Sequence, residues 1–180
     1  MSGHSKWHNI KHQKQSTDVK RGKIFSKLSR LISIVAKEKG GDPNDNPQLR
    51  TAIEKAREAN MPKDKIERAI KKGTGEIEGI KMEEVIYEAY GPNGIALIIK
   101  GITDNRNRTS SEIRHILNRF NGKLAASNSV KYLFDKKQED WISKYPLEIA
   151  DEKIKTQLEK LFEELDENYD VQEIYSNIKE

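Results

Sequence analysis

The first half of the chain contains three stretches in which apolar residues recur every three or four positions, a spacing that predicts helices. The first stretch, 23–39, stops at a group of glycine and proline residues. The second, 46–60, should begin with Asn46 as its N-cap and a proline at the next position. The third, 62–72, is expected to end at Gly73. Short connections between these helices predict a small three-helix domain.

The second half of the chain changes to the alternating pattern of strands. Segments 85–90 and 95–101 flank the turn Gly91-Pro92-Asn93-Gly94 and should form a hairpin. A helix that ends at Gly122 is expected to begin with a capping box at 109–112. The remaining expected elements are a strand at 130–134, a short strand at 147–149, a helix at 151–166 and a strand at 171–175.

These elements predict an α+β protein of two parts. A helical domain, 20–73, follows a basic arm, 1–19, which contains too few apolar residues to order itself by burial and is expected to be mobile without its ligand. A linker, 74–80, leads to a domain at 81–180. We expect this second domain to be a mostly antiparallel sheet with two helices, ferredoxin-like in class.

Charge is distributed unevenly along the 180 residues. Residues 1–39 hold ten Lys or Arg against two acids, whereas residues 135–180 hold fourteen acids against seven Lys or Arg, and the whole chain is only +4. A one-sign segment of this density repels itself, and nucleic-acid phosphates are the commonest partner that offsets the repulsion. The basic end of the chain therefore predicts contact with nucleic acid.

The composition also bears on the compartment. The absence of cysteine excludes disulfides and thiolate metal sites and is compatible with a reducing compartment. The longest apolar run, Ile95 to Ile99, is far shorter than the roughly 20 residues of a membrane helix. The basic N-terminus lacks the apolar region of a signal peptide and the Arg-rich amphipathic pattern of a transit sequence. We therefore expect a mature cytoplasmic protein without a membrane partner.

On a helix at 23–39 the apolar stripe and most basic side chains fall on different sides, so one face can pack while another presents charge. We predict that this charged face and the arm contact nucleic acid. The residues expected to contribute are Lys6, Trp7, His8, Lys11, His12, Lys14, Lys20, Arg21, Lys23, Lys27 and Arg30.

The aromatic and histidine residues of the arm have alternative interpretations. Trp7 either anchors the arm on the helical domain or stacks on a base, which contributes about 1–3 kcal/mol where it occurs. His4, His8 and His12 would share one face of a helix, as metal ligands sometimes do, but their neighbours are cationic and poor helix formers. We expect these histidines to contact phosphates or bases, and we expect no metal.

A polar run, 104–109, lies between an expected strand and an expected helix. Backbone N–H groups at a helix start favour an anion, and Arg106 and Arg108 would strengthen such a site. The same residue types abound in plain turns and N-caps. The run is therefore either an accessory phosphate site or ordinary turn structure.

The sequence carries no motif for catalysis. It has no Gly-rich phosphate loop, no metalloprotease histidine pair and no nucleophile elbow. The numerous glutamates of 159–173 are typical of a solvated helix face. We expect a protein that is not an enzyme and uses no cofactor and no small-molecule substrate.

Several runs of residues resemble the YebC/PmpR family. The resemblance is continuous to about residue 135 and returns at 146–177. The runs that carry it are Gly3-His4-Ser5-Lys6-Trp7, Asn9-Ile10-Lys11-His12, Arg21-Gly22-Lys23, Gly41-Asp42-Pro43-Asn44, Tyr87-Glu88 with Tyr90-Gly91-Pro92, and Thr103-Asp104-Asn105-Arg106-Asn107-Arg108-Thr109.

The resemblance implies a non-enzymatic protein with a helical N-terminal domain and two α/β domains, described in bacteria as a DNA-binding transcriptional regulator. It implies a second role as well, because relatives, including mitochondrial ones, are translational activators that associate with ribosomes and help them through difficult sequences such as proline runs. The chain departs from the family after Phe134, where a further α/β domain is usually inserted and where 135–145 is expected simply to bridge the gap. It therefore resembles a short form, to which functions of the inserted domain do not carry over.

Three classes of function remain. The first is a regulator that binds duplex DNA with weak sequence preference, because the basic helix lacks the Arg/Asn/Gln cluster of major-groove readout. The second is a ribosome-associated translation factor whose arm orders on structured ribosomal or transfer RNA. The third is a protein-interaction module whose basic tail binds acidic partners. The same basic residues suit DNA and RNA equally, so the sequence does not separate the first two.

Overall fold

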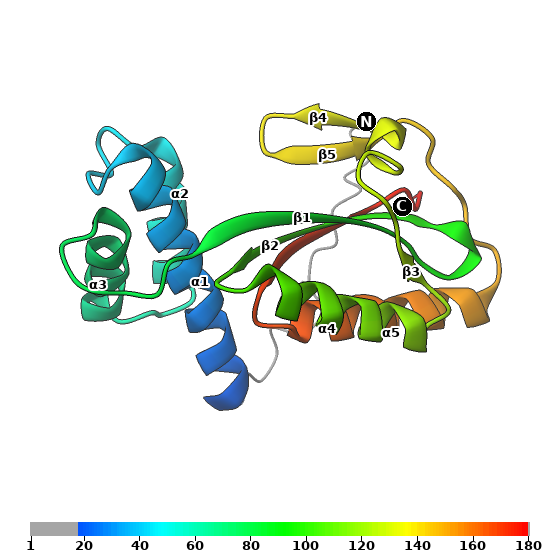
Figure 1. Ribbon diagram of the computed structural model, residues 1–180, viewed down its shortest axis with the longest axis horizontal. Helices are drawn as coiled ribbons and strands as arrows, with labels where there is room; N and C mark the ends of the chain where they lie inside the picture. The colour runs from blue at the N-terminus through cyan, green and yellow to red at the C-terminus, as the bar shows by residue number, and fades with distance from the viewer. Residues whose placement is uncertain (1–17, 180) are drawn as a thin grey trace. The chain divides into compact units, whose positions relative to one another are not determined.

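The computed structural model describes residues 18–179 as two compact units, a helical unit and an α+β unit (Figure 1). The helical unit comprises the described residues up to Glu84 together with Ile102–Asp104, and the α+β unit comprises Val85–Gly101 and the residues from Asn105 onward. The expected α+β class is confirmed. The helices are α1 (Asp18–Lys39), α2 (Pro47–Glu58), α3 (Lys63–Thr74), α4 (Arg106–Arg119) and α5 (Glu152–Glu167). The strands are β1 (Glu83–Tyr90), β2 (Ala96–Thr103), β3 (Lys123–Leu124), β4 (Phe134–Lys137), β5 (Asp140–Ser143) and β6 (Val171–Ser176), with 3-10 turns η2 (Pro92–Gly94) and η3 (Lys131–Leu133).

Asn46 joins the end of α1 to the start of α2. Its side-chain oxygen accepts a hydrogen bond from the backbone N–H of Leu49, which confirms the predicted N-cap. Its side-chain amide donates to the carbonyl oxygens of Val35 and Gly40 at 3.1 and 2.9 Å. These bonds satisfy the polar groups of the fully buried Asn46 side chain and, with them, backbone groups at two helix ends.

The end of α3 differs from the prediction. Gly73 lies inside the helix, and Gly75, with a φ of +80°, is the residue that caps it. A Cβ on Gly73 would lie 2.3 Å from the carbonyl oxygen of Ser33 and 2.9 Å from the Cβ of Ala36. The sequence suggests a stop at Gly73 because glycine is a common cap, but this glycine is required by the close approach of α1 to α3.

We expect Gly73→Ala to lower the free energy of unfolding of the helical unit by about 2 kcal/mol, because the new methyl group would push α1 from α3. Gly22→Ala is the matched control, since nothing lies within 4 Å of a Cβ there. At this helical, solvent-exposed position the alanine should stabilise by up to about 1 kcal/mol. Urea unfolding followed by helical circular dichroism measures both changes, and equal stability of the two variants would contradict the prediction.

The core of the helical unit draws on all three helices and on the end of β2. Its buried members include Ile32 and Val35 of α1 and, from α2, Leu49, Ala52, Ile53 and Ala56. Ile102 of β2, only 2% exposed, packs in the same cluster. Helix α1 is longer than predicted, because it begins at Asp18 and so includes the last two residues that we assigned to the arm.

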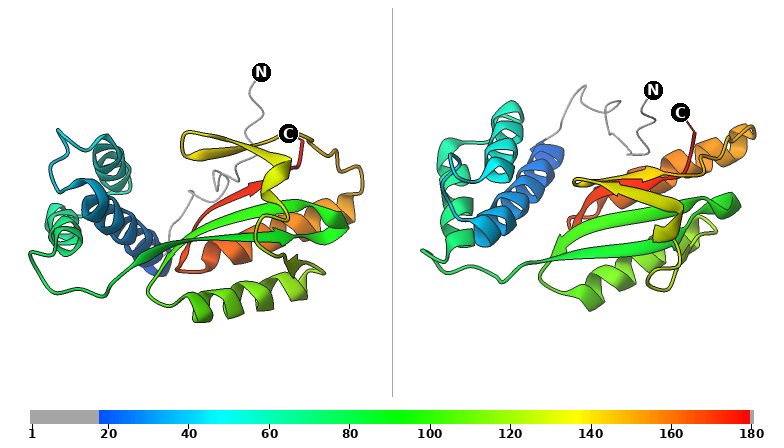
Figure 2. Two further views of the ribbon diagram at one scale, coloured as in Figure 1. Left: turned by 45° about the horizontal axis from the view of Figure 1, so that its top comes forward. Right: turned by 90° about the horizontal axis from the view of Figure 1, so that it is seen from above.

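The sheet of the α+β unit has the strand order β3-β1-β2-β6. Helices α4 and α5 cover one of its faces, as Figures 1 and 2 show. Leu97 and Ile99 of β2 point into the core under these helices, together with Leu117 and Leu161. The chain order of the sheet strands and covering helices is β-β-α-β-α-β, a variation on the β-α-β-β-α-β order of ferredoxin-like folds.

The other face of the sheet is covered by the antiparallel hairpin of β4 and β5 (Figure 2). Trp141 and Phe134 of the hairpin pack in one cluster with Ile98 and Tyr175 of the sheet. The Tyr175 hydroxyl lies within hydrogen-bond distance of the carboxylates of Glu173 and Asp140, at 2.8 and 3.0 Å, and burial together with these carboxylates raises its pKa. Residues 135–145 are therefore a structured cover for the sheet, and the expectation of a simple bridge was wrong.

Two short strands predicted from alternation were also wrong. Within 130–134, the turn η3 takes up Lys131–Leu133 and β4 begins only at Phe134, because the backbone N–H groups of Val130 and Lys131 bond to a carboxylate instead of a neighbouring strand. Segment 147–149 makes a single parallel bridge, between Leu147 and Ile178. A short alternating run predicts a strand only where a neighbouring strand is available to pair with it.

Candidate nucleic-acid interface

The first half of α1 presents several of the predicted contact residues. Lys20 and Arg21 are exposed, and Lys23 and Lys27 are partly exposed. Positions 20, 23 and 27 are three and four residues apart, which places them on one face of the helix. Arg21 forms a surface ion pair with Asp18 at 3.6 Å, an interaction that solvent screens strongly. A run of cations along one helix face suits the spaced charges of a phosphate backbone.

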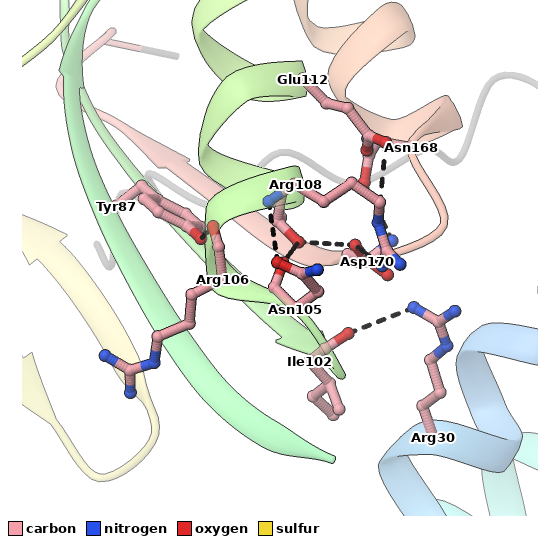
Figure 3. Close-up of polar contacts among 10 residues, drawn as sticks. Arg30, Tyr87, Ile102, Asn105, Arg106, Arg108, Glu112, Asn168 and Asp170 are labelled. Atoms are coloured by element: carbon pink, nitrogen blue, oxygen red, sulfur yellow. Dashed lines mark hydrogen bonds and ion pairs between the residues drawn. The ribbon is translucent and has the colours of Figure 1, made fainter. Parts of the chain in front are cut away.

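Arg30 differs from the other cations of α1. Its guanidinium donates to the carbonyl oxygen of Ile102 at 3.2 Å, within the helical unit (Figure 3). Ile34, one turn further along α1, is 4% exposed and belongs to the core. Arg30 and Ile34, in the middle of α1, therefore serve the packing of the unit, whereas cations at both ends of the helix are exposed.

The arm residues of the prediction lie outside the described part of the chain. They are Lys6, Trp7, His8, Lys11, His12 and Lys14, together with His4 of the considered metal set.

Arg108 is held in a network that joins the start of α4 to the turn before β6 (Figure 3). Its guanidinium lies 2.7 Å from a carboxylate oxygen of Asp170, whose side chain is 2% exposed. The hydroxyl of Thr109 donates to the same oxygen at 2.6 Å. Arg108 also pairs with Glu112 at 3.7 Å, and Glu112 accepts a hydrogen bond from Asn168. A buried carboxylate needs such partners, so this arginine stabilises the fold.

The helix start at 104–109 also differs from the predicted capping box. Helix α4 begins at Arg106, and Asn105 is its N-cap, accepting from the backbone N–H of Arg108 at 3.1 Å. Thr109 is fully buried and bonds to Asp170 rather than capping. The run 104–109 was expected to be either a phosphate site or ordinary turn structure. The hydrogen bonds of Asn105 and Thr109 are those of a turn and an N-cap.

Arg106 remains a candidate for phosphate contact. Its side chain is exposed in the first turn of α4 and points away from the Asp170 network in Figure 3. Its backbone oxygen accepts a hydrogen bond from the hydroxyl of Tyr87 on β1 at 3.1 Å. The anchored backbone places the guanidinium at the surface of the α+β unit.

Glu88 is an important residue that the sequence analysis did not single out. It is 4% exposed, and its carboxylate accepts hydrogen bonds from the backbone N–H groups of Asn128, Val130 and Lys131 at 2.6, 2.7 and 2.9 Å. Burial alone would raise the pKa of Glu88, but these bonds and the Lys131 ammonium lower it below the ordinary value of 4.5. The signals in the sequence were its place in the family motif Tyr87-Glu88 and its charge within a strand pattern.

Other kinds of site find little support between residues 18 and 179. That part of the chain holds no group of three His, Asp or Glu side chains arranged for a metal ion. Its helices also lack the combination of length and apolar character that crossing a membrane requires.

Comparison with known proteins identifies the family. Residues 5–76 match the TACO1/YebC protein N-terminal domain, and residues 82–139 match the TACO1/YebC second and third domain. The chain belongs to the TACO1/YebC family, which confirms the resemblance seen in its motifs.

Curated relatives and a solved structure agree with this assignment. A protein of Petrotoga mobilis named "Probable transcriptional regulatory protein" is 55% identical over 97% of this chain and 69% of its own length. A protein of the same name from Fervidobacterium nodosum is 61% identical over 76% of this chain and 54% of its own length. The crystal structure of a conserved hypothetical protein from Aquifex aeolicus covers 96% of both chains with a TM-score of 0.86 and 36% identity. The chain thus spans between about half and two thirds of the curated relatives it matches.

Proposed function

We propose that this chain is a nucleic-acid-binding regulator of gene expression that acts without catalysis. The observation that carries the proposal is the ratio of ten Lys or Arg to two acids in residues 1–39, with Lys20, Lys23 and Lys27 on one face of α1. The name of the curated relatives, "Probable transcriptional regulatory protein", supports the same reading. Contact would be made by the basic arm and the start of α1, with duplex DNA as the ligand.

The second candidate is a ribosome-associated translational activator that binds structured RNA. It is favoured by the composition of the contact residues, which are mostly Lys with one Trp and interspersed His and lack Asn or Gln for reading base edges. Such a set is suited to irregular RNA, in which bases are available for stacking.

We expect binding to either polymer to depend strongly on salt. About six phosphate contacts should lower the affinity roughly a thousandfold between 50 and 200 mM salt. Titrating the full chain with a duplex DNA and a structured RNA of equal phosphate number measures the dependence and compares the two candidates. Tighter binding to the RNA at every salt concentration would favour the second candidate. Affinity independent of salt would contradict both and leave the protein-interaction module.

A further inference from the structure

The surface of the α+β unit contains a hollow of about 450 Å³ between α4, β1 and the segment that follows β3. Five residues of β3 and the segment after it, 123–127, form one wall, and β1 contributes Ile86, Tyr87 and Glu88. From α4 come Ser110, Arg114 and Asn118, spaced four residues apart and therefore on one helix face. We call this hollow the α4 groove.

Two cations, Arg114 of α4 and Lys123 of β3, give the α4 groove its charge. Both residues are exposed. Neither makes an ion pair within residues 18–179, although most other cations near the sheet do so, including Lys100 with Glu173 and Arg119 with Glu164. What sets these two unpaired cations apart is that they share one hollow, in a part of the chain where acids outnumber bases.

The carboxylate in the wall of the α4 groove does not neutralise these cations. Glu88 uses its oxygens to accept three backbone N–H bonds and lies 3.7 Å from the ammonium of Lys131. Its role is to hold residues 128–131, next to the wall, in place. The remaining polar side chains of the groove, Ser110, Asn118 and Ser127, can donate hydrogen bonds to an anion.

The cationic face continues along α4 beyond the hollow. Arg106 lies four residues before Ser110, and the Tyr87 hydroxyl that binds its backbone belongs to the groove wall. At 1.5 Å per residue, Arg106 and Arg114 are separated by roughly 12 Å along the helix axis. A single small anion does not span this distance, whereas the backbone of a nucleic-acid strand does.

We infer that the α4 groove is a second nucleic-acid contact, in which Arg114 and Lys123 bind backbone phosphates of a single strand and Arg106 extends the track. The inference deepens the proposed function and rests on it. It gives the α+β unit, which is acidic as a whole, a direct part in binding rather than the role of a scaffold for the basic end of the chain.

The test compares two double variants of the full chain. The groove variant combines Arg114→Ala and Lys123→Ala, and the control variant combines Lys153→Ala and Lys160→Ala. The control removes two exposed cations of α5 that likewise make no ion pair among the described residues. The probe is a labelled oligouridylate of about 20 nucleotides. The groove variant should lose about 1.4 from the slope of log affinity against log salt and bind roughly 25-fold more weakly at 0.1 M salt. The control should match the original chain, and both variants should keep its melting temperature.

Three results would overturn the inference. A groove variant that binds like its control would refute the groove while leaving the proposed function intact. Displacement of the oligonucleotide by inorganic phosphate, but not by chloride at equal ionic strength, would make the groove a small-anion pocket. No binding of the original chain at 50 mM salt to this probe or to duplex DNA would refute the proposed function and the groove together.

Discussion

Reversing Lys20, Lys23 and Lys27 to glutamate is expected to weaken nucleic-acid binding by a factor of roughly 100 to 1,000 at 0.1 M salt. Each phosphate contact with duplex DNA contributes about 0.9 to the salt slope, so the loss of three contacts lowers the slope by about 2.7. The fold should survive, because these side chains lie outside the buried cluster of the helical unit. At position 20, in the first turn of α1, glutamate also interacts favourably with the helix dipole.

The matched control reverses Arg50, Lys55 and Arg68, which are exposed on α2 and α3. The control changes the net charge by the same amount, so it separates a specific surface from general electrostatic attraction. Arg30 is left unchanged because its bond to Ile102 would confound binding with stability. Fluorescence anisotropy over a salt series gives both the affinity and the slope of log affinity against log salt. Equal losses in the two triple variants would reject the α1 face as the contact surface.

Replacing Glu88 by glutamine should destabilise the α+β unit by about 3 kcal/mol at pH 7. The amide has the same shape, but it has only one accepting oxygen and would direct its own N–H groups at the backbone donors of residues 128–131. For a unit of this size the loss corresponds to roughly 10–20 °C in melting temperature. Glu88 is only 4% exposed, so a mismatched amide costs more there than it would at the surface.

The same variant gives a test of pH dependence. The pKa of Glu88 is lowered in the folded protein, so its stabilisation is present above the ordinary value of 4.5 and is lost as the pH falls through the folded value. The difference in stability between the original chain and Glu88→Gln should therefore shrink below pH 4.5. Glu159→Gln, at an exposed position of α5, should differ little from the original chain at any pH. A difference that stays constant between pH 7 and pH 3 would show that the carboxylate charge is irrelevant.

The starts of two helices show when local sequence predicts an N-cap correctly and when it does not. Asn46 was predicted as a cap because an amide side chain followed by proline suits that position whatever surrounds it. The capping box at 109–112 looked equally suitable, yet Thr109 is drawn to Asp170, which lies 61 residues away in the sequence. A local rule succeeds when no distant group competes for the same hydroxyl.

Arginines illustrate the same limit for the candidate site. Arg106 and Arg108 are indistinguishable as phosphate ligands in the sequence, but Arg108 is paired with a buried carboxylate, whereas Arg106 points away from that network (Figure 3). Arg114 and Lys123 belong to no recognisable motif. They become candidate phosphate ligands only because α4 and β3 line the same hollow. Charge is visible in a sequence, whereas the availability of a charge depends on its spatial neighbours.

By itself, the order of residues determined the α+β class, the three helices of the first half, the concentration of cations near the N-terminus and the family. These properties depend on periodicity, composition and contiguous motifs, all of which are local. Folding in three dimensions decided that Gly73 is a contact rather than a helix end, that the hairpin of β4 and β5 covers the sheet, and that Glu88 holds a distant turn. Each of these depends on backbone or side-chain groups more than 35 residues apart, because packing and hydrogen bonding act on proximity in space.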